Sequence, residues 1–160
     1  MSYLPIADYL PHRPPMLLLD RVIEAAESHI VCEATLQVDS PFCDGAAVPG
    51  WVGVEYMAQA VGVLAGWRAL ARQLPIRLGF LVGTRHYRSH VPQFRVSEVL
   101  RVTADAELMP DEGLVAMRCA IHDAAGALLA DALLLLFQPS DVEAYLQQEA
   151  AARTEPSASQ

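Results

Sequence analysis

The stretch PGWVGVEYMAQAVGVLAGWRALARQLP, residues 49–75, decides the fold of this 160-residue chain. No residue from Gly50 to about Gln73 forbids a helix, and Pro75 cannot continue one. Up to Trp67 the stretch carries a single charged side chain and is apolar on every face, which is typical of a helix enclosed by other elements. The sequence therefore predicts one long central helix.

Strand-like segments lie on both sides of this helix. The segment from His29 to Val38 alternates apolar and polar residues, the period of a half-buried strand. The other predicted strands are Met16–Ile23, Ile76–Val91, Leu100–Leu108, Leu114–His122 and Leu128–Phe137, of which the last four are expected to form an antiparallel meander. Small helix residues are predicted to let strands approach closely, namely Gly53, Ala58, Gly62, Ala65 and Gly66. An antiparallel sheet wrapped around one long central helix is an α+β arrangement.

Length and composition predict a single domain. A chain of 160 residues, 53% of them hydrophobic, buries one sizeable core and is too short for two ordinary domains. We expect the domain to cover residues 1–149 and to end in a short helix, Asp141–Ala150, in which Ser140 is the cap and Glu143 its capping-box partner. Residues 150–160 lack apolar periodicity and are expected to form a flexible tail.

Cysteine usage and the chain start indicate a reduced, cytoplasmic protein. Cys32, Cys43 and Cys119 are odd in number and far apart, so they form neither a disulfide framework nor a pair with metal-ligand spacing. The start, Met1 to Leu10, lacks the basic and apolar regions of a secretory signal. No apolar run reaches the roughly 18 to 20 residues of a membrane span. We expect no membrane span and no cofactor.

The charge of −8 argues against DNA or RNA as a partner, because nucleic-acid binders carry a basic footprint. All eleven basic side chains are Arg, and seven of them lie between Arg68 and Arg101, where Glu98 is the only acid.

The five histidines are scattered and offer no metal spacing, so no metal is expected. The sequence predicts His12, between prolines, as a turn residue with hydrogen-bonded nitrogens; His86, Arg88 and His90 would share one face of a strand.

Glu55 is the outlier within the predicted helix. A carboxylate in a helix that is apolar all round loses water, which makes it a candidate acid or base. The alternative is a buried Glu satisfied by a neighbouring Arg or by backbone donors. Gln59, four residues on, shares its helical face and is predicted to orient it.

The start of the predicted helix offers a second candidate group. Gly50 and Trp51 would carry free backbone N–H groups, which form a site for a thioester carbonyl or an oxyanion. Such a site about one turn from a carboxylate suits chemistry alpha to a thioester. The alternative is that Gly50 simply makes a tight turn.

Three motifs resemble those of beta-hydroxyacyl-(acyl carrier protein) dehydratases. The motifs are PHRPPMLLLDRV (residues 11–22), PGWVGVEYMAQ (residues 49–59) and GFLVG (residues 79–83). They occur in the order expected of that family and span roughly Leu10 to Phe137. The resemblance implies a hotdog fold, a dimer with a continuous sheet and a substrate tunnel along the interface.

When the roles of the family's residues are carried over by position, the resemblance implies that Glu55 is the catalytic carboxylate. It also implies that the N–H groups of Gly50 and Trp51 form the carbonyl site. Gly79 and Gly83 match the strand whose backbone lines the acyl chain. The family also has a catalytic His in a Gly-His-Phe-Pro loop before the helix, but here the corresponding loop, FCDGAAVP (residues 42–49), is shorter and contains no His. This pattern looks like the dehydratase-like subunits of aryl polyene biosynthesis, which act beside a second hotdog subunit.

Three functions follow from these observations. The first is a 3-hydroxyacyl-acyl carrier protein dehydratase or dehydratase subunit that forms trans-2-enoyl thioesters, with a His from outside the usual loop as the base. If the chain is active alone, the candidates for this base are His12, His86 and Asp44. The second is a non-catalytic partner that stabilises an active hotdog subunit, and the third is an acyl thioesterase. In the first two cases we expect a homodimer or a heterodimer, and an acidic acyl carrier protein docking on the Arg-rich segment at Arg85 and Arg88.

Overall fold

The structure, a computed structural model, describes residues 2–154. Its largest element is a six-stranded antiparallel sheet with the strand order β1-β2-β6-β7-β8-β4. The strands are β1 Arg21–Ala26, β2 His29–Thr35, β4 Phe80–Ser89, β6 Val99–Leu108, β7 Gly113–His122 and β8 Leu128–Gln138. A small second sheet pairs β3 (Ala47–Pro49) with β5 (Gln93–Arg95). A 3-10 turn, Ile6–Asp8, opens the chain.

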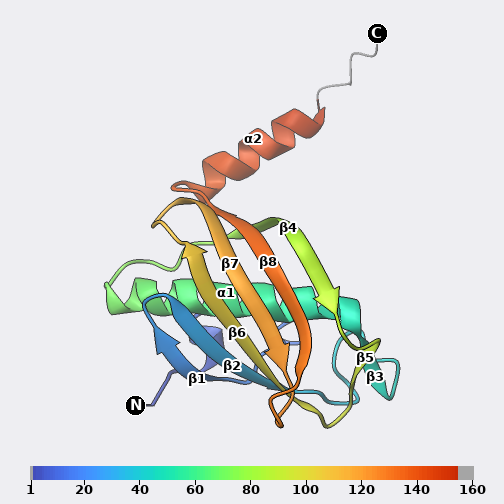
Figure 1. Ribbon diagram of the computed structural model, residues 1–160. Coiled ribbons are helices and arrows are strands. Elements are labelled where there is room, and N and C mark those ends of the chain that lie inside the picture. Colours follow the sequence, from blue (N-terminus) through green and yellow to red (C-terminus); the bar gives the residue numbers. More distant parts are fainter. Residues whose placement is uncertain (1, 155–160) are drawn as a thin grey trace.

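The long helix α1, Gly53–Ala71, lies across the concave face of the sheet (Figure 1). A 3-10 turn, Gly50–Val52, leads into it, so the predicted continuous helix is divided near its start. Tyr56, Met57 and Leu64 of the helix are fully buried against sheet residues such as Ile30. The predicted α+β arrangement of an antiparallel sheet around one central helix is confirmed.

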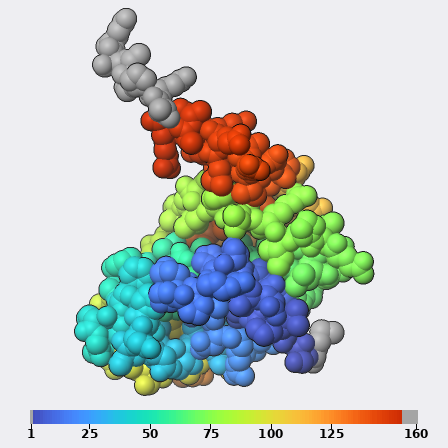
Figure 2. Space-filling view, turned by 180° about the vertical axis from the view of Figure 1, so that it is seen from behind, coloured from blue at the N-terminus to red at the C-terminus, as the bar shows by residue number. Residues whose placement is uncertain are grey.

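The back of α1 is covered by the N-terminal segment rather than by a strand (Figure 2). A Cβ atom at Gly66 would lie 2.2 Å from the Tyr9 carbonyl oxygen, and one at Gly62 would lie 2.6 Å from Leu10 Cδ2. The prediction that small helix residues admit close neighbours therefore holds for these two glycines, but their neighbour is residues 9–10. Gly53 does face a strand, since a Cβ there would lie 2.2 Å from the Tyr87 hydroxyl of β4.

The apolar run that begins at Met16 was predicted as a strand, which is wrong for its first five residues. β1 begins only at Arg21. The Leu18 N–H donates to the Gln59 side chain of α1 at 2.9 Å instead of to a neighbouring strand. Leu18 and Leu19 are buried, so the run is apolar because it packs on the helix.

The predicted four-stranded meander is correct only for β6, β7 and β8. β4 pairs with β8 and not with β6, although it precedes β6 in the chain. The other edge of β6 is occupied by β2, which pairs with it along its whole length, His29–Thr35. Burial alternates along β2 as its sequence predicts.

The C-terminal helix α2, Val142–Thr154, projects from the end of β8 (Figure 1). Asp141 caps it, because its Oδ1 accepts from the Ala144 N–H at 3.0 Å. The predicted Ser140 and Glu143 capping box is therefore wrong by one residue. The helix continues four residues beyond Ala150, where the tail was expected to begin, and residues 155–160 of that expected tail lie outside the described residues.

The three cysteines are free thiols, as predicted. Burial raises the pKa of Cys32 to about 12, and burial together with Asp105 raises that of Cys119 to about 12. Both are therefore protonated near neutral pH and behave as small core residues. No helix within residues 2–154 is long and apolar enough to cross a membrane.

Candidate active site

A cavity of about 170 Å³ lies between the N-terminal segment, α1 and the chain that leads into β4. Its polar lining includes His12, Glu55 and Gln59. Apolar residues from each of these elements complete the walls, among them Leu10, Val61 and Leu78. The cavity therefore combines an acidic group with space for an apolar ligand.

Glu55 lies in the first turn of α1 and contributes its carboxyl group to this cavity. Its side chain is 34% exposed, so the expectation that it is fully buried is wrong. The reason is its position beside the cavity, which leaves that face of the helix uncovered. Neither an Arg nor a backbone donor satisfies it within residues 2–154, so the predicted alternative is also not what the structure shows.

Gln59 holds Glu55 in place. Its Nε2 donates to Glu55 Oε1 at 2.9 Å and to the Met16 carbonyl at 2.8 Å, while its Oε1 accepts from the Leu18 N–H at 2.9 Å. The Gln59 side chain is 1% exposed. These three bonds fix the amide, and the contact with Glu55 predicted from the four-residue spacing is present.

His12 is the residue that sequence reasoning placed wrongly. Its Nε2 lies 3.9 Å from Glu55 Oε1, and its side chain is 37% exposed. Its Nδ1 is buried and has no hydrogen-bond partner within residues 2–154, which contradicts the expected turn residue with hydrogen-bonded nitrogens. A buried polar atom without a partner costs about 1–3 kcal/mol. The only available signal was its place in the PHRPP motif, since the distance to Glu55 spans 43 residues of chain.

The predicted carbonyl site at Gly50 is partly wrong. The Gly50 N–H donates to the Pro92 carbonyl at 2.9 Å, so it is not free. A Cβ at Gly50 would lie 2.4 Å from Ser89 Oγ and 2.7 Å from the Val91 carbonyl oxygen, which means that this glycine is needed for a close approach of the chain after β4. Neither Gly50 nor Trp51 lines the cavity, and the Trp51 side chain is 62% exposed.

The two glycines assigned to acyl binding differ in position. Gly79 lines the cavity, whereas Gly83 is not among its lining residues. A Cβ at Gly79 would make only an ordinary contact, 3.8 Å from the Phe137 carbonyl oxygen. Leu81, between them, also lines the cavity.

Arg85 and Arg88 are exposed on β4, the edge strand of the sheet. Neither forms an ion pair with any residue from 2 to 154. By contrast, Arg68 and Arg72 are paired with Glu27 and Asp111 near the end of α1. Within the Arg-rich segment, the charges of the helix arginines are therefore neutralised by acids, whereas those of the two β4 arginines are available to a partner.

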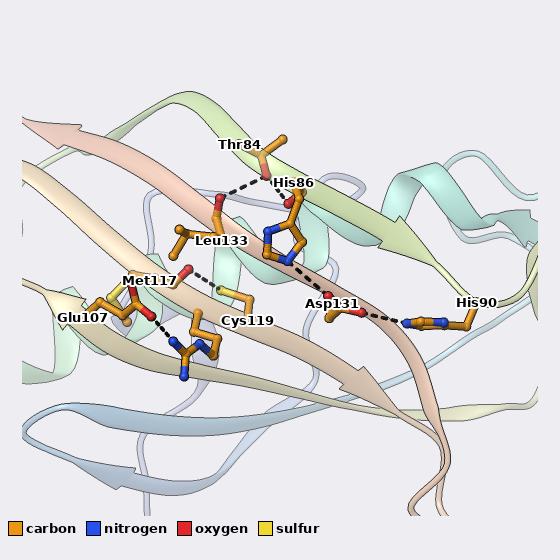
Figure 3. A network of polar contacts seen from close by, with 9 residues as sticks. Thr84, His86, His90, Glu107, Met117, Cys119, Asp131 and Leu133 are labelled. Atoms are coloured by element: carbon orange, nitrogen blue, oxygen red, sulfur yellow. Dashed lines mark hydrogen bonds and ion pairs between the residues drawn. The ribbon is translucent and has the colours of Figure 1, made fainter.

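Asp131 joins two histidines on the outer side of β4 and β8 (Figure 3). Its Oδ2 lies 2.7 Å from His90 Nε2 and its Oδ1 lies 3.1 Å from His86 Nε2. The hydrogen bond to His90, and secondly that to His86, holds the pKa of the Asp131 carboxyl below its ordinary value. No group of three or more His, Cys, Asp or Glu side chains among the described residues is arranged so that it could hold a metal ion.

Asp131→Asn is expected to lower the free energy of unfolding by about 1 kcal/mol near neutral pH, since both contacts are partly exposed. A carboxyl whose pKa is lowered by folding stabilises the protein above its unfolded pKa of about 3.9, and this contribution is lost as pH falls through the folded pKa. Urea unfolding of both proteins between about pH 7 and about pH 3 measures the difference. A difference that does not shrink toward low pH would contradict the assignment.

Comparisons with known proteins place this chain. Residues 4–147 match the model of the ApeP-like family, described as ApeP dehydratase. The chain is 42% identical over 64 residues to the 3-hydroxyacyl-[acyl-carrier-protein] dehydratase FabZ of Streptococcus uberis and 43% identical over 60 residues to that of Streptococcus pyogenes serotype M1. These matches cover 37% and 34% of this chain and 46% and 43% of the relatives, so they span less than half of the relatives' length.

Among solved structures, the chain resembles the dehydratase heterocomplex ApeI:P from Xenorhabdus doucetiae, with a TM-score of 0.84 and 35% identity over 92% of this chain and 99% of that one. Zebrafish thioesterase superfamily member 2 has a TM-score of 0.60 at 16% identity, covering 83% of this chain and 89% of that one, and supports the fold alone. The fold is the hotdog fold implied by the sequence resemblance. The chain belongs to the ApeP-like dehydratase family.

Proposed function

We propose that this chain is a catalytic subunit of a 3-hydroxyacyl-acyl carrier protein dehydratase that forms trans-2-enoyl thioesters in fatty acid or aryl polyene type biosynthesis. The observation that carries the proposal is the Glu55 carboxyl group, which lines an otherwise largely apolar cavity and is fixed by Gln59. The named proteins that are at least 35% identical to this chain are dehydratases. We place the protein in the cytoplasm, where its free thiols stay reduced.

Glu55 acts as the acid of this reaction. Its Oε1 accepts the Gln59 hydrogen bond, which leaves Oε2 to carry a proton toward the 3-hydroxyl group. Protonation lets the C3–O bond break and water leave, while a base removes the C2 proton and its electron pair forms the C2=C3 bond. Trp51 does not line the cavity, but it lies about one helical turn before Glu55. Its N–H is the remaining candidate donor to the thioester carbonyl, because the Pro92 carbonyl accepts the Gly50 N–H.

The apolar walls of the first cavity offer room for the acyl chain beyond the acid. A second cavity of about 340 Å³ adjoins the first, but charged side chains such as Arg68, Arg72 and Asp111 line it. We therefore assign the acyl chain to the first cavity. Gly79, at the first cavity, leaves space for it, as the family resemblance implies.

The protein assembles with a second hotdog subunit in this proposal. The ApeI:P structure is described as a heterocomplex, which favours a heterodimer over a homodimer for this chain. The missing His in the loop of residues 42–49 favours a second candidate, a non-catalytic subunit that stabilises an active partner. A thioesterase remains the third candidate.

Product analysis tests the function. The purified chain, alone and with the second hotdog subunit from its gene neighbourhood, is incubated with a 3-hydroxyacyl thioester of acyl carrier protein, and the products are resolved by mass spectrometry. Formation of the enoyl thioester, 18 mass units lighter because water is lost, is the expected result. Release of the free acid would instead indicate hydrolysis, and no product in either assembly would contradict the proposal.

The exposed arginines of β4 are the proposed docking site for the acidic carrier protein. The double change Arg85→Glu and Arg88→Glu is expected to weaken carrier binding about tenfold or more and to flatten its dependence on salt. Surface plasmon resonance at several salt concentrations measures this. Arg95→Glu and Arg101→Glu form the matched control, because these arginines of β5 and β6 are also exposed and without an ion pair to any residue from 2 to 154. Equal weakening by both pairs would exclude a specific site.

A further inference from the structure

We propose that His12 is the second acid–base group of the site and that it comes from the same chain as Glu55. The inference rests on the proposed dehydratase function. It assigns a base in place of the His that is missing from residues 42–49. The pair is then complete within one subunit, whereas the family resemblance implies a pair formed by residues of two subunits.

His12 and Glu55 face the same cavity. His12 Nε2 lies 3.9 Å from Glu55 Oε1, and both side chains line the same cavity. Their exposed fractions, 37% and 34%, leave room for a substrate to contact both. Because His12 Nδ1 is buried, Nε2 is the ring nitrogen that exchanges protons with a ligand in the cavity.

The segment that carries His12 is held against α1. On its N-terminal side, the Tyr9 backbone contacts α1 at Gly66, and the Leu10 side chain contacts it at Gly62. On its C-terminal side, the Gln59 side chain binds the Met16 carbonyl and the Leu18 N–H. The segment is therefore fastened to α1 on both sides of His12, and Gln59 fixes this segment and Glu55 at the same time.

The His12 ring contributes little to stability. Its Nδ1 has no partner within residues 2–154, and its Nε2 is too far from Glu55 for a direct hydrogen bond. A buried polar atom without a partner is destabilising and calls for an explanation, of which a catalytic role is one. A catalytic role accounts for the position of the His12 ring, which faces a carboxyl group in a cavity and adds little to stability.

The proton balance of the reaction closes with this pair. At the start Glu55 carries a proton and His12 Nε2 has a free lone pair. His12 Nε2 takes the C2 proton, the C2–H electron pair forms the double bond, and the C3–O bond breaks as Glu55 protonates the departing hydroxyl group. The water that is released can bridge the 3.9 Å between His12 Nε2 and Glu55 Oε1 and relay the proton from His12 back to Glu55, so no co-reactant is consumed.

The test uses the functional assembly and four variants. His12→Gln is expected to lower kcat by about 10²- to 10⁴-fold, the usual contribution of a positioned acid or base. His12→Phe is expected to lower kcat equally without lowering Tm, because it removes the unpaired nitrogen. Added imidazole is expected to restore part of the activity of His12→Ala. The matched control is His122→Gln, at the end of β7 and outside the cavity, which should leave kcat unchanged.

The outcomes separate this inference from the proposed function. If Glu55→Gln abolishes turnover but His12→Gln does not change it, His12 is not the base, while the dehydratase function stands. If both changes are silent, the proposed function fails as well. A lowered Tm in His12→Phe without rescue of His12→Ala by imidazole would assign His12 a structural role and overturn the inference.

Discussion

Replacing Glu55 by Gln is expected to lower the kcat of dehydration by about 10²- to 10⁴-fold, with little change in Tm. Gln has nearly the same volume and its carbonyl oxygen still accepts the hydrogen bond that Gln59 donates to Glu55 Oε1. The change therefore removes the acidic proton of the Glu55 carboxyl group and leaves the packing around the side chain unchanged. Steady-state kinetics on a 3-hydroxyacyl carrier-protein thioester, with thermal unfolding of the same samples, measures both quantities.

The control for this prediction is Glu24→Gln, on the exposed side of β1 and outside the cavity. It removes one carboxylate from the surface and should leave kcat unchanged. An assembly that keeps full activity with Glu55→Gln, but loses activity when the chain is omitted, would favour the non-catalytic stabilising subunit.

Gly66→Ala is expected to give the largest loss of stability. The new Cβ would lie 2.2 Å from the Tyr9 carbonyl oxygen and 3.0 Å from its Cα, so the backbone of the N-terminal segment must move. Overpacking of this kind costs about 1–3 kcal/mol, and the gain of about 1 kcal/mol in helix propensity offsets only part of this cost. Because backbone cannot yield as a side chain can, we expect a net loss of about 2 kcal/mol by urea unfolding. Activity should fall too, because Tyr9 lies three residues before His12.

Gly62→Ala provides the graded comparison on the same face of α1. Its new Cβ would meet only the end of the Leu10 side chain, at 2.6 Å, and that side chain can rotate. We therefore expect less than about 1 kcal/mol of destabilisation. Equal losses in the two variants would mean that the contact between Tyr9 and Gly66 does not hold the N-terminal segment.

Local patterns in the sequence predicted the long helix and the longer strands, but not the short strands β3 and β5. The uniformly apolar run after Gly50 predicted the enclosed helix, and alternation predicted β2. The order of the strands was not predictable in this way, because β4 and β6 present similar patterns and only long-range pairing puts β4 beside β8. The run at Met16–Asp20 was mistaken for a strand because packing on a helix and pairing in a sheet select the same apolar residues.

In the site, too, local contacts were predictable from the sequence and long-range contacts were not. The contact between Glu55 and Gln59 follows from a four-residue spacing on one helix, and the structure contains it. The position of His12 depends on a path of the N-terminal segment that no local pattern encodes. The Gly50 N–H was expected to be free because the rules for helix ends consider only local bonds. They do not include a tertiary hydrogen bond to Pro92, which is 42 residues away.

The most direct test of the central claim measures dehydration by a complex in which the second subunit's own acid and base side chains have been replaced. If this chain carries a working site, enoyl thioester still forms, and the additional change Glu55→Gln abolishes it. Loss of all turnover in the complex with the intact chain, while a complex of the intact second subunit with Glu55→Gln remains fully active, would contradict the claim.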